Sequence, residues 1–382
     1  MAIQSRENTD KGMPDILVPF YNRDKAIGPD PQETQTFAAR CHCRNIQFTI
    51  TLPTSILPLN AYICNCTTCR YTHGTFGSFH VSLPQGIAPE YTNLSVNLSV
   101  FKTPGSGPGG HGQRLFCPTC GSHSGHFEPW VAQWVVDVAL FDAPIFWTFT
   151  RAAFPKSPGD GGLLSFWRTP SSGKELVQVS PGHDVPPRYE NRVGADGGEM
   201  LRAECCCGGV SFAIPRPSAA VAADAYMRQY ISPRDPRKWK AFLDFCRDCG
   251  RVSSAPVVPW VLVPRAVLEP EVPPDLRLGT VKTYASSEKV TRGFCGRCGA
   301  TVFLKTTLRS PSERSEVLNV AMGILRAPEG AKAEDWVTWR AGKPAWADDA
   351  REYDPEFVDA IVQGHREWSL EKYGDAPDFD VI

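Results

Sequence analysis

The sequence has no excess of charge of either sign. Its 382 residues include 40 Lys and Arg and 41 Asp and Glu, for a formal net charge of -1. This balance gives no electrostatic reason to expect binding to nucleic acid or to an anionic membrane. The basic run PRDPRKWK at 233–240 is interpreted as a solvated loop. We therefore expect a small-molecule substrate as the partner, with no nucleic acid and no membrane.

The sequence also lacks signals for export and for membrane insertion. The stretch MAIQSRENTDKGMPD has no basic-then-apolar order of the kind that marks a secretory signal. The most apolar window, 130–149, is interrupted by Asp137, Asp142 and Pro144. We therefore expect a cytoplasmic protein. Because that compartment keeps thiols reduced, its 14 cysteines are expected to bind metal where they cluster at short spacing, and not to form disulfides.

The cysteines fall into two sets that follow one order. Each set begins with a C-x-C turn, continues with a cluster that ends in C-x-x-C, and closes with another C-x-x-C pair. The first set is Cys41, Cys43, Cys64, Cys66, Cys69, Cys117 and Cys120, and the second is Cys205, Cys206, Cys207, Cys246, Cys249, Cys295 and Cys298. The flanks repeat too, since LFCPTCGS at 115–122 matches GFCGRCGA at 293–300. The sequence therefore predicts an internal duplication.

A duplicated chain of this length predicts two domains, each large enough to bury its own core. We expect a flexible lead over 1–33, a first domain over 34–180, a linker over 181–198 and a second domain over 199–382. The linker is assigned to PGHDVPPRYENRVGADGG because that stretch is rich in Pro and Gly and weakly apolar.

Short β-branched or aromatic runs bounded by Pro and Gly predict strands. These runs are NIQFTITL, FGSFHVSL, WVVDVALF, GVSFAIP and PWVLVP. The 34 prolines disfavour long helices. One helix is predicted near the C-terminus, capped by Asp354 with Pro355 at its first position, and it is expected to pack on the second domain. The predicted fold is mainly β, with antiparallel sheets and a C-terminal helix.

Four cysteines of each set have the pattern of a closed zinc site. A C-x-C turn and a distant C-x-x-C pair supply four thiolates, and structural zinc usually takes four protein ligands in a tetrahedron. The two predicted ligand sets are Cys41, Cys43, Cys117 and Cys120, and Cys205, Cys207, Cys295 and Cys298. Since each set joins distant segments, its metal should contribute directly to the free energy of folding. Buried free thiols are the alternative interpretation.

The cluster CNCTTC supplies three thiols, from Cys64, Cys66 and Cys69, and no fourth cysteine. Three protein ligands leave one zinc position for water or substrate, as in catalytic sites. With about one net negative charge, such a site repels an incoming thiol less than a four-thiolate site does. Arg70 could neutralise the thiolates or a substrate carboxylate, and His73 could act as a general base. The alternatives are a structural zinc completed by His73 or another side chain, a surface position for Arg70, and a hydrogen-bonded structural role for His73.

The second set departs from this pattern at the corresponding cluster. Asp244 takes the position of the first cysteine, and Gly250 stands where the first set has an arginine. Because Asp can bind zinc through oxygen, Asp244, Cys246 and Cys249 could form a fourth site. Equally, this repeat could have lost its metal. Cys206, the middle residue of its C-x-C turn, is expected to point away from the ion.

The turn Cys41-His-Cys43, the cluster CNCTTCR and the pair FCPTCGS resemble the motifs of the glutathione-dependent formaldehyde-activating enzyme (GFA) family, whose domain also occurs in centromere protein V. The resemblance covers about 34–170 and 200–345. It implies a β-tent fold in each domain, a structural zinc on the C-x-C and C-x-x-C pairs, and a second zinc on the C-x-C-x-x-C cluster. The implied activity is a carbon–sulfur lyase reaction that joins or releases glutathione and formaldehyde as S-hydroxymethylglutathione.

Three classes of function remain open on the sequence. The first is a zinc-dependent carbon–sulfur lyase that uses the three-cysteine site, with the second domain supporting or degenerate. The second is a zinc enzyme that acts on a non-thiol metabolite bound through oxygen. The third is a non-catalytic zinc scaffold, which the absence of a basic or disordered tail disfavours. The expected cofactor is Zn²⁺ in two structural sites and one open site, with a fourth site left open.

Overall fold

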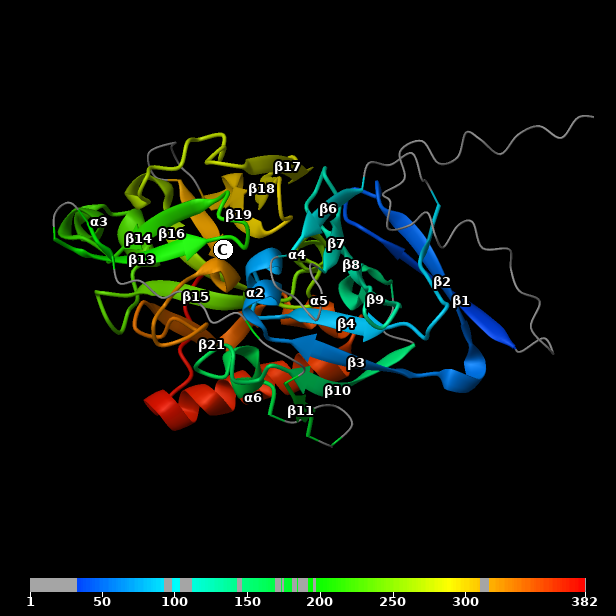
Figure 1. The fold of residues 1–382 in the computed structure, drawn as a ribbon. Coiled ribbons are helices and arrows are strands. Elements are labelled where there is room, and N and C mark those ends of the chain that lie inside the picture. Colours follow the sequence, from blue (N-terminus) through cyan, green and yellow to red (C-terminus); the bar gives the residue numbers. More distant parts are fainter. Residues whose placement is uncertain are drawn as a thin grey trace, which may run out of the picture.

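A computed structural model gives the fold of the chain (Figure 1). It describes residues 33–92, 98–103, 112–142, 146–168, 173, 175–180, 184, 192–194, 197–309 and 316–381. We call the described residues up to 180 the first half and those from 192 onward the second half. The predicted lead, apart from Glu33, and most of the predicted linker lie outside the described residues, so the domain boundaries stay predictions.

The first half contains two sheets. A three-stranded sheet has the order β1-β2-β5, and an eight-stranded sheet has the order β11-β10-β3-β4-β9-β8-β7-β6. Neighbouring strands are antiparallel except where β10 pairs with β3 and β11. The strands are β1 (Thr34–Arg40), β2 (Gln47–Pro53), β3 (Leu59–Cys64), β4 (Ser78–Ser82), β5 (Glu90–Tyr91), β6 (Ser99–Lys102), β7 (Gln113–Phe116), β8 (His123–Glu128), β9 (Gln133–Asp137), β10 (Trp147–Ala153) and β11 (Val177–Val179). Helix α2 (Thr67–His73) follows β3.

The second half repeats the topology of the larger sheet, whereas the third strand of its smaller sheet pairs with β13, the counterpart of β1, and not with the counterpart of β2. Its sheets have the orders β12-β13-β14 and β17-β18-β19-β20-β16-β15-β21, and the second order matches β6-β7-β8-β9-β4-β3-β10 strand for strand. The strands are β12 (Arg192–Val193), β13 (Glu199–Glu204), β14 (Ser211–Pro215), β15 (Trp239–Asp244), β16 (Val258–Pro264), β17 (Val281–Ser287), β18 (Val290–Cys295), β19 (Thr301–Thr306), β20 (Val317–Ala321) and β21 (Val337–Ala345). Helix α4 (Arg247–Ser253) follows β15 as α2 follows β3. A shorter helix, α3 (Ala219–Ala223), follows β14.

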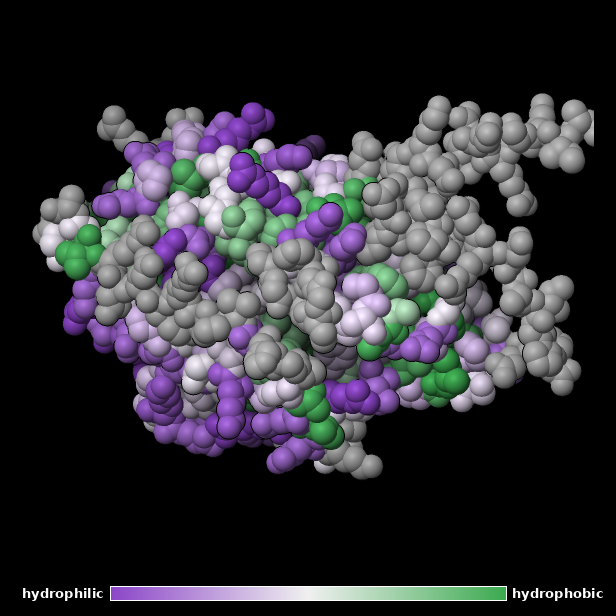
Figure 2. All heavy atoms as spheres, in the orientation of Figure 1, coloured by the Kyte–Doolittle hydropathy of each residue, from purple (hydrophilic) through white to green (hydrophobic). Residues whose placement is uncertain are grey.

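Each predicted strand run contains a strand, although WVVDVALF is a strand only as far as Asp137 and continues as a 3-10 turn over Val138–Leu140. In β2, Phe48, Ile50 and Leu52 are buried and alternate with more exposed residues, as expected for a sheet that packs on one face. In β16 every residue is buried because both faces of the sheet are covered. The prediction of a mainly β fold is confirmed. On the face shown in Figure 2, hydrophobic residues form separate groups among hydrophilic ones.

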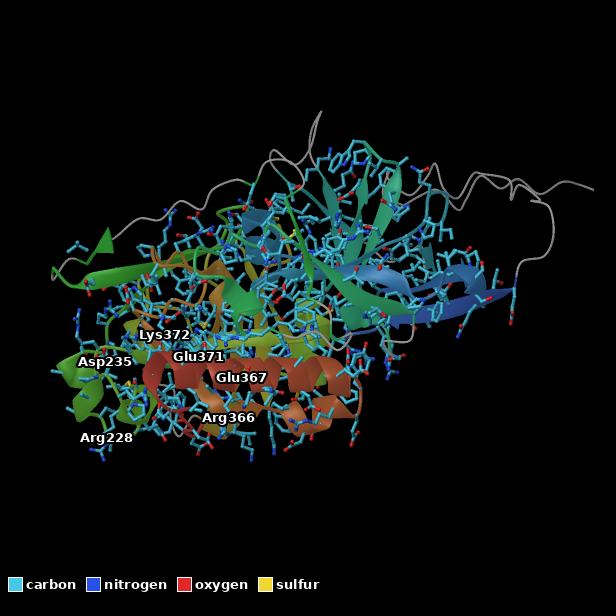
Figure 3. The ribbon with its side chains drawn as sticks, turned by 90° about the horizontal axis from the view of Figure 1, so that it is seen from below. Arg228, Asp235, Arg366, Glu367, Glu371 and Lys372 are labelled. Atoms are coloured by element: carbon cyan, nitrogen blue, oxygen red, sulfur yellow. The ribbon has the colours of Figure 1, made fainter. Side chains whose placement is uncertain are left out.

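The C-terminal helix α6 (Pro355–Tyr373) is also confirmed, with the predicted cap. The Asp354 carboxylate accepts a hydrogen bond from the Phe357 N–H at 3.1 Å. The helix packs on both halves, whereas the sequence predicted contact with the second domain. Its Phe357 ring lies 5.0 Å from the ring of Trp167 in the first half, and the helix also contacts β21 in the second half. Figure 3 shows α6 crossing the lower side of the molecule, with the short helix α5 (Ala347–Arg351) preceding it in the chain.

The two halves share one apolar core and meet through reciprocal contacts. One continuous cluster of buried side chains runs from Phe37 to Trp368. Gly121 packs against Phe294, and Gly299 packs against Phe116, so the glycine after each closing C-x-x-C pair meets a phenylalanine of the other half. The two glycines have φ values of +85° and +78°.

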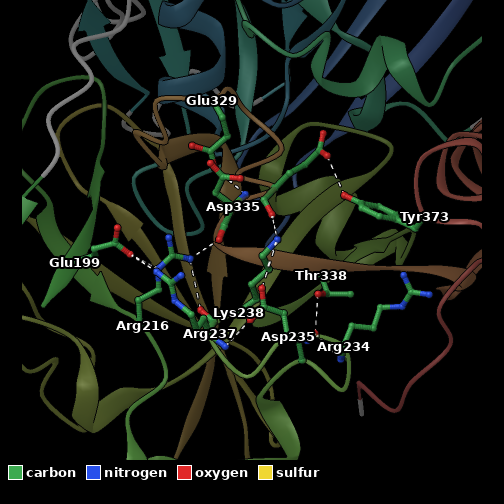
Figure 4. Close-up of polar contacts among 12 residues, drawn as sticks. Glu199, Arg216, Arg234, Asp235, Arg237, Lys238, Glu329, Asp335, Thr338 and Tyr373 are labelled. Atoms are coloured by element: carbon green, nitrogen blue, oxygen red, sulfur yellow. Dashed lines mark hydrogen bonds and ion pairs between the residues drawn. The ribbon is translucent and has the colours of Figure 1, made fainter.

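Charged groups also connect separate strands of the second half (Figure 4). The Glu199 carboxylate on β13 accepts hydrogen bonds from Arg216 and Arg237, each at 2.9 Å. The Tyr373 hydroxyl at the end of α6 donates to the Glu334 carboxylate at 2.9 Å. These contacts connect the start of β13 with the segments after β14 and before β15, and the end of α6 with the segment before β21.

Candidate metal centres

The four cysteines predicted for the closed site of the first half come together. Their Sγ atoms all lie within 4.8 Å of one another. Cys43 Sγ lies 3.5 Å from the Sγ atoms of Cys41 and Cys117. Thiolates about 2.3 Å from one zinc ion lie about 3.8 Å apart in a tetrahedron, so the spacing fits the ion. The Ile46 N–H donates to Cys41 Sγ at 3.2 Å and would stabilise a thiolate there.

The second half has the same arrangement in its closed cluster. Cys205, Cys207, Cys295 and Cys298 also have their Sγ atoms within 4.8 Å of one another. The Val210 N–H donates to Cys205 Sγ at 3.3 Å, as Ile46 does to Cys41 in the first half. Each closed cluster therefore fits one zinc ion, and each joins a turn of the smaller sheet to the end of a strand in the larger sheet.

The three-thiol cluster of the first half lies where β3 ends and α2 begins. Cys64 ends the strand, Cys66 caps the helix and Cys69 lies in the first turn. Their Sγ atoms lie within 4.8 Å of one another, and no fourth His, Cys, Asp or Glu atom joins this group among the described residues. As whole residues, Cys64 and Cys69 are buried and Cys66 is half-buried. This donor set fits zinc, and all three of its thiols are buried.

Two residues that the sequence did not single out lie beside Cys69. The Arg114 guanidinium donates from Nη2 to Cys69 Sγ at 3.1 Å. His80 is hydrogen bonded through Nε2 to Ser78 Oγ, and its Nδ1 lies 3.1 Å from Asp137 Oδ1. Burial lowers the pKa of His80, but Asp137 outweighs burial and, with Cys69, raises that pKa to about 9.

Arg70 and His73 lie next to the cluster but not among its ligand atoms. Arg70 is 1 % exposed, and its guanidinium lies 5.1 Å from the ring of Tyr71, at the contact between the halves. His73 Nδ1 lies 3.0 Å from the Cys69 carbonyl oxygen, and its Nε2 lies 3.3 Å from Asp137 Oδ1. Both ring nitrogens therefore face protein acceptors, and a general-base role for His73 stays a prediction.

In the second half, Asp244, Cys246 and Cys249 also come within 4.8 Å of one another. The Arg292 guanidinium donates to Cys249 Sγ at 3.3 Å, as Arg114 does to the third thiol of the first half. Asp244 is already engaged, because its Oδ1 accepts from the Cys246 N–H at 2.8 Å and its Oδ2 accepts from Trp260 Nε1 at 3.0 Å. Burial raises the pKa of Asp244.

A cavity of about 310 Å³ adjoins this second cluster. Cys246 lines it together with residues of α4 and of the segment that joins α5 to α6. Arg247 and Tyr353 also line it, with the Arg247 guanidinium 3.7 Å from the centre of the Tyr353 ring. The half-buried Cys246 is therefore the thiol through which a small molecule would reach the second cluster.

Each C-x-C turn also contacts the cluster helix of the other half. His42 Nε2, in the first turn, lies 3.4 Å from Asp248 of α4, and its Nδ1 is hydrogen bonded to the Tyr284 hydroxyl at 2.8 Å. Cys206, in the second turn, donates its N–H to the Tyr71 carbonyl of α2 at 3.1 Å. Cys206 belongs to none of the metal-capable groups of the described residues, and burial raises the pKa of its thiol to about 12.

Four residues near the three-ligand clusters were not predicted from the sequence, and only two of them are marked by a sequence pattern. Arg114 and Arg292 each precede a closing C-x-x-C pair by three positions. This repeated position could have identified both arginines from the sequence. His80 and Asp137 carry no such signal, because only the pairing of β4 with β9 brings them opposite each other.

The comparisons with known proteins agree with this architecture. A model of the family of glutathione-dependent formaldehyde-activating enzymes matches residues 36–155 and 229–340, which together cover more than half of the chain. The comparison with curated proteins found no match. Among the described residues, no helix is long and apolar enough to cross a membrane. The two matched segments, together with the repeated larger sheet and the paired cysteine clusters, show that the chain belongs to the glutathione-dependent formaldehyde-activating enzyme family.

Proposed function

We propose that the protein is a zinc-dependent enzyme of the carbon–sulfur lyase type that acts on an adduct of a thiol and formaldehyde. The observation that carries this proposal is the group of Cys64, Cys66 and Cys69, which has no fourth ligand atom among the described residues. Glutathione is the proposed thiol because of the family to which the chain belongs. The cytoplasm is the proposed location, since the cysteines need to stay reduced.

The proposed reaction makes or breaks one carbon–sulfur bond. In the forming direction the thiol sulfur bonds to the aldehyde carbon, the carbonyl π pair moves to oxygen, and the thiol proton ends on that oxygen. In the reverse direction the hydroxyl proton returns to sulfur as the bond breaks. A zinc ion bound by the three thiolates would favour the thiolate form of the substrate and polarise the aldehyde oxygen.

The side chains around the cluster support this chemistry by their charge and position. Arg114 offsets part of the negative charge of three thiolates, so a further anionic sulfur meets less repulsion. All three thiols are buried, so the cluster is shielded from bulk water. Arg70 adds positive charge at the contact between the halves, and His73 supports the buried Asp137.

In this proposal the second half stabilises the first half and is not catalytic, and its cluster has Asp244 in place of one thiol. Asp244 replaces a thiol and already accepts two hydrogen bonds, so its oxygens are less available to a metal than a free carboxylate. The proposed zinc content is therefore two ions in the closed clusters and one in the three-thiol cluster. A fourth ion at Asp244, Cys246 and Cys249 is the remaining candidate.

The test compares Cys66→Ser with Cys43→Ser. Cys66→Ser should stay folded, lose one zinc ion and lose formation of the thiol–formaldehyde adduct. Cys43→Ser should lose the fold, because structural zinc contributes directly to folding. Zinc content by elemental analysis, circular dichroism and adduct formation followed by NMR are the measurements. Two or fewer zinc ions in the freshly purified wild type would contradict the proposal.

Calorimetric titration with glutathione then identifies the class of substrate. Heat of binding that disappears in Cys66→Ser would support a thiol substrate at this cluster. No heat at millimolar glutathione, with three zinc ions present, would instead support a metabolite that binds through oxygen. Equal metal loss and equal unfolding in the two variants would support a scaffold without catalysis.

A further inference from the structure

The cluster of the second half has one thiol fewer than its counterpart in the first half. Asp244 ends β15, where the first half has Cys64 at the end of β3. The sulfur atoms of Cys246 and Cys249 lie within 4.8 Å of each other at the start of α4, and both residues are free thiols. The second half therefore keeps the C-x-x-C pair of the cluster and lacks the third sulfur.

Asp244 is held by donors of the protein itself. The residue is 4 % exposed. Its Oδ1 accepts from the Cys246 N–H at 2.8 Å, and its Oδ2 accepts from Trp260 Nε1 at 3.0 Å. Zinc usually takes four protein ligands in structural sites and three in catalytic sites. Two thiols and an engaged carboxylate are a weaker set than either cluster of the first half, so the two sulfurs are free to react with each other.

The two thiols differ in their access to the surface. The Cys246 thiol is half-buried, and the residue lines the cavity of about 310 Å³. Cys249 is 2 % exposed, and its Sγ accepts a hydrogen bond from the Arg292 guanidinium at 3.3 Å. Thiol–disulfide exchange needs one sulfur that an incoming disulfide can reach, and a second sulfur close enough to displace the first adduct. Cys246 meets the first requirement and Cys249 the second.

The charges around the cavity indicate which molecules it would admit. Arg247 is the one cationic residue among the described residues of the lining, and its guanidinium donates to the carbonyl oxygens of Ala139 and Phe141. The lining also has three carboxylates, which would attract a positively charged ligand. The volume is at the lower end of the range for small-molecule sites, about 300–1,000 Å³. The three acidic residues are Asp349, Glu352 and Asp354.

We propose that Cys246 and Cys249 form a redox-active dithiol that reduces low-mass disulfides with positively charged groups. The inference depends neither on the three-thiol cluster nor on the proposed lyase activity. In the first step Cys246 Sγ bonds to one sulfur of the disulfide, whose S–S bond breaks and releases one thiol. In the second step Cys249 Sγ bonds to Cys246 Sγ and releases the other thiol. Two protein thiols are oxidised to one disulfide, the external disulfide is reduced to two thiols, and the two protons end on those products.

The test treats the intact, reduced protein with cystamine, a disulfide with an amino group at each end. The wild type should release about two molecules of cysteamine per chain and gain a disulfide between Cys246 and Cys249. Cys249→Ser should release about one and keep the other half on Cys246, and Cys246→Ser should lose the reaction of this pair. Cys206→Ser is the matched control, because Cys206 lies outside the metal-capable groups, and it should react like the wild type. Cysteamine in the ultrafiltrate and peptide mapping by mass spectrometry are the measurements.

The charge of the disulfide tests the class of ligand. Dithiodiglycolate carries a carboxylate at each end, so at low ionic strength it should oxidise the pair about 10-fold more slowly than cystamine does. Equal rates for the two reagents would overturn the assignment of a positively charged ligand.

A pair that stays reduced in cystamine would overturn the inference. A pair that reacts only after a chelator has removed a fourth zinc ion would overturn it in favour of a metal site at Asp244, Cys246 and Cys249. If a serine variant does not fold, the peptide map of the wild type decides, because it shows directly whether the new disulfide joins these two cysteines. Absence of thiol–formaldehyde adduct formation in a protein that still forms this disulfide would overturn the proposed function alone.

Discussion

Single glycines fix how closely the halves approach each other. A Cβ on Gly121 would lie 2.7 Å from Cγ of Phe294, and one on Gly299 would lie 2.9 Å from Cγ of Phe116. Both glycines also have positive φ, a conformation that other residues adopt at a cost of about 1–2 kcal/mol. The glycine after each closing C-x-x-C pair is therefore required twice, by the turn and by the neighbouring half.

Gly121→Ala should destabilise the protein through both effects. The left-handed backbone costs about 1–2 kcal/mol and the overlap with Phe294 a further 1–3 kcal/mol, about 2–5 kcal/mol together. Gly86→Ala is the matched control, because Gly86 has φ of +83° and a Cβ added there would have nothing within 4 Å. Urea unfolding of both variants measures the difference. Equal losses in the two variants would show that the contact with Phe294 does not matter.

The features of this site that could be predicted from the sequence are those made by cysteines a few positions apart. The closed clusters and the three-thiol cluster were predicted because each is built from C-x-C and C-x-x-C turns that bring thiols together locally. The contact between His80 and Asp137 was not predicted, because it depends on the register in which β4 pairs with β9. The burial of both ring nitrogens of His73 was missed because the acceptors, the Cys69 carbonyl and Asp137, are supplied by the fold.

At the scale of the elements, α6 is the helix whose sequence signals were clearest. Asp354, Pro355 and the final Gly374 have the positions expected of a cap, a first helical residue and a left-handed stop. Its partners were not visible in the sequence, because its apolar face is shared between the two halves. Phe357 contacts Phe79 and Trp167, which lie in the first half.

Asp354→Ala should shorten or fray the start of α6. The change removes the acceptor for the Phe357 N–H and should lower the free energy of unfolding by about 1 kcal/mol. Asp354→Asn keeps an oxygen in the same place and should restore most of this loss. Thermal unfolding followed by circular dichroism measures both variants. An Asn variant as unstable as the Ala variant would show that the carboxylate charge matters and the capping bond does not.

Over the whole molecule, the two halves behave as one packed body. Their side chains form one continuous core, and α6 contacts both halves. The N–H of Gly323 donates to the Gly74 carbonyl at 3.1 Å, and the N–H of Cys206 donates to Tyr71, so the second half touches both the end and the interior of α2. The proposed reactive cluster is therefore supported from the second half even though its three thiols come from the first.

Cys205→Ser tests this coupling, because it removes a thiol from the closed cluster of the second half. If the halves fold together, the variant should lose adduct formation and the metal of the three-thiol cluster, although Cys64, Cys66 and Cys69 are unchanged. The wild type should unfold in one calorimetric transition whose calorimetric and van't Hoff enthalpies agree. A first half that keeps its metal and its own transition in Cys205→Ser would contradict the coupling. Since the turn that contains Cys205 also carries Cys206 against α2, loss of its metal would reach the reactive cluster through the Tyr71 contact as well as through the shared core.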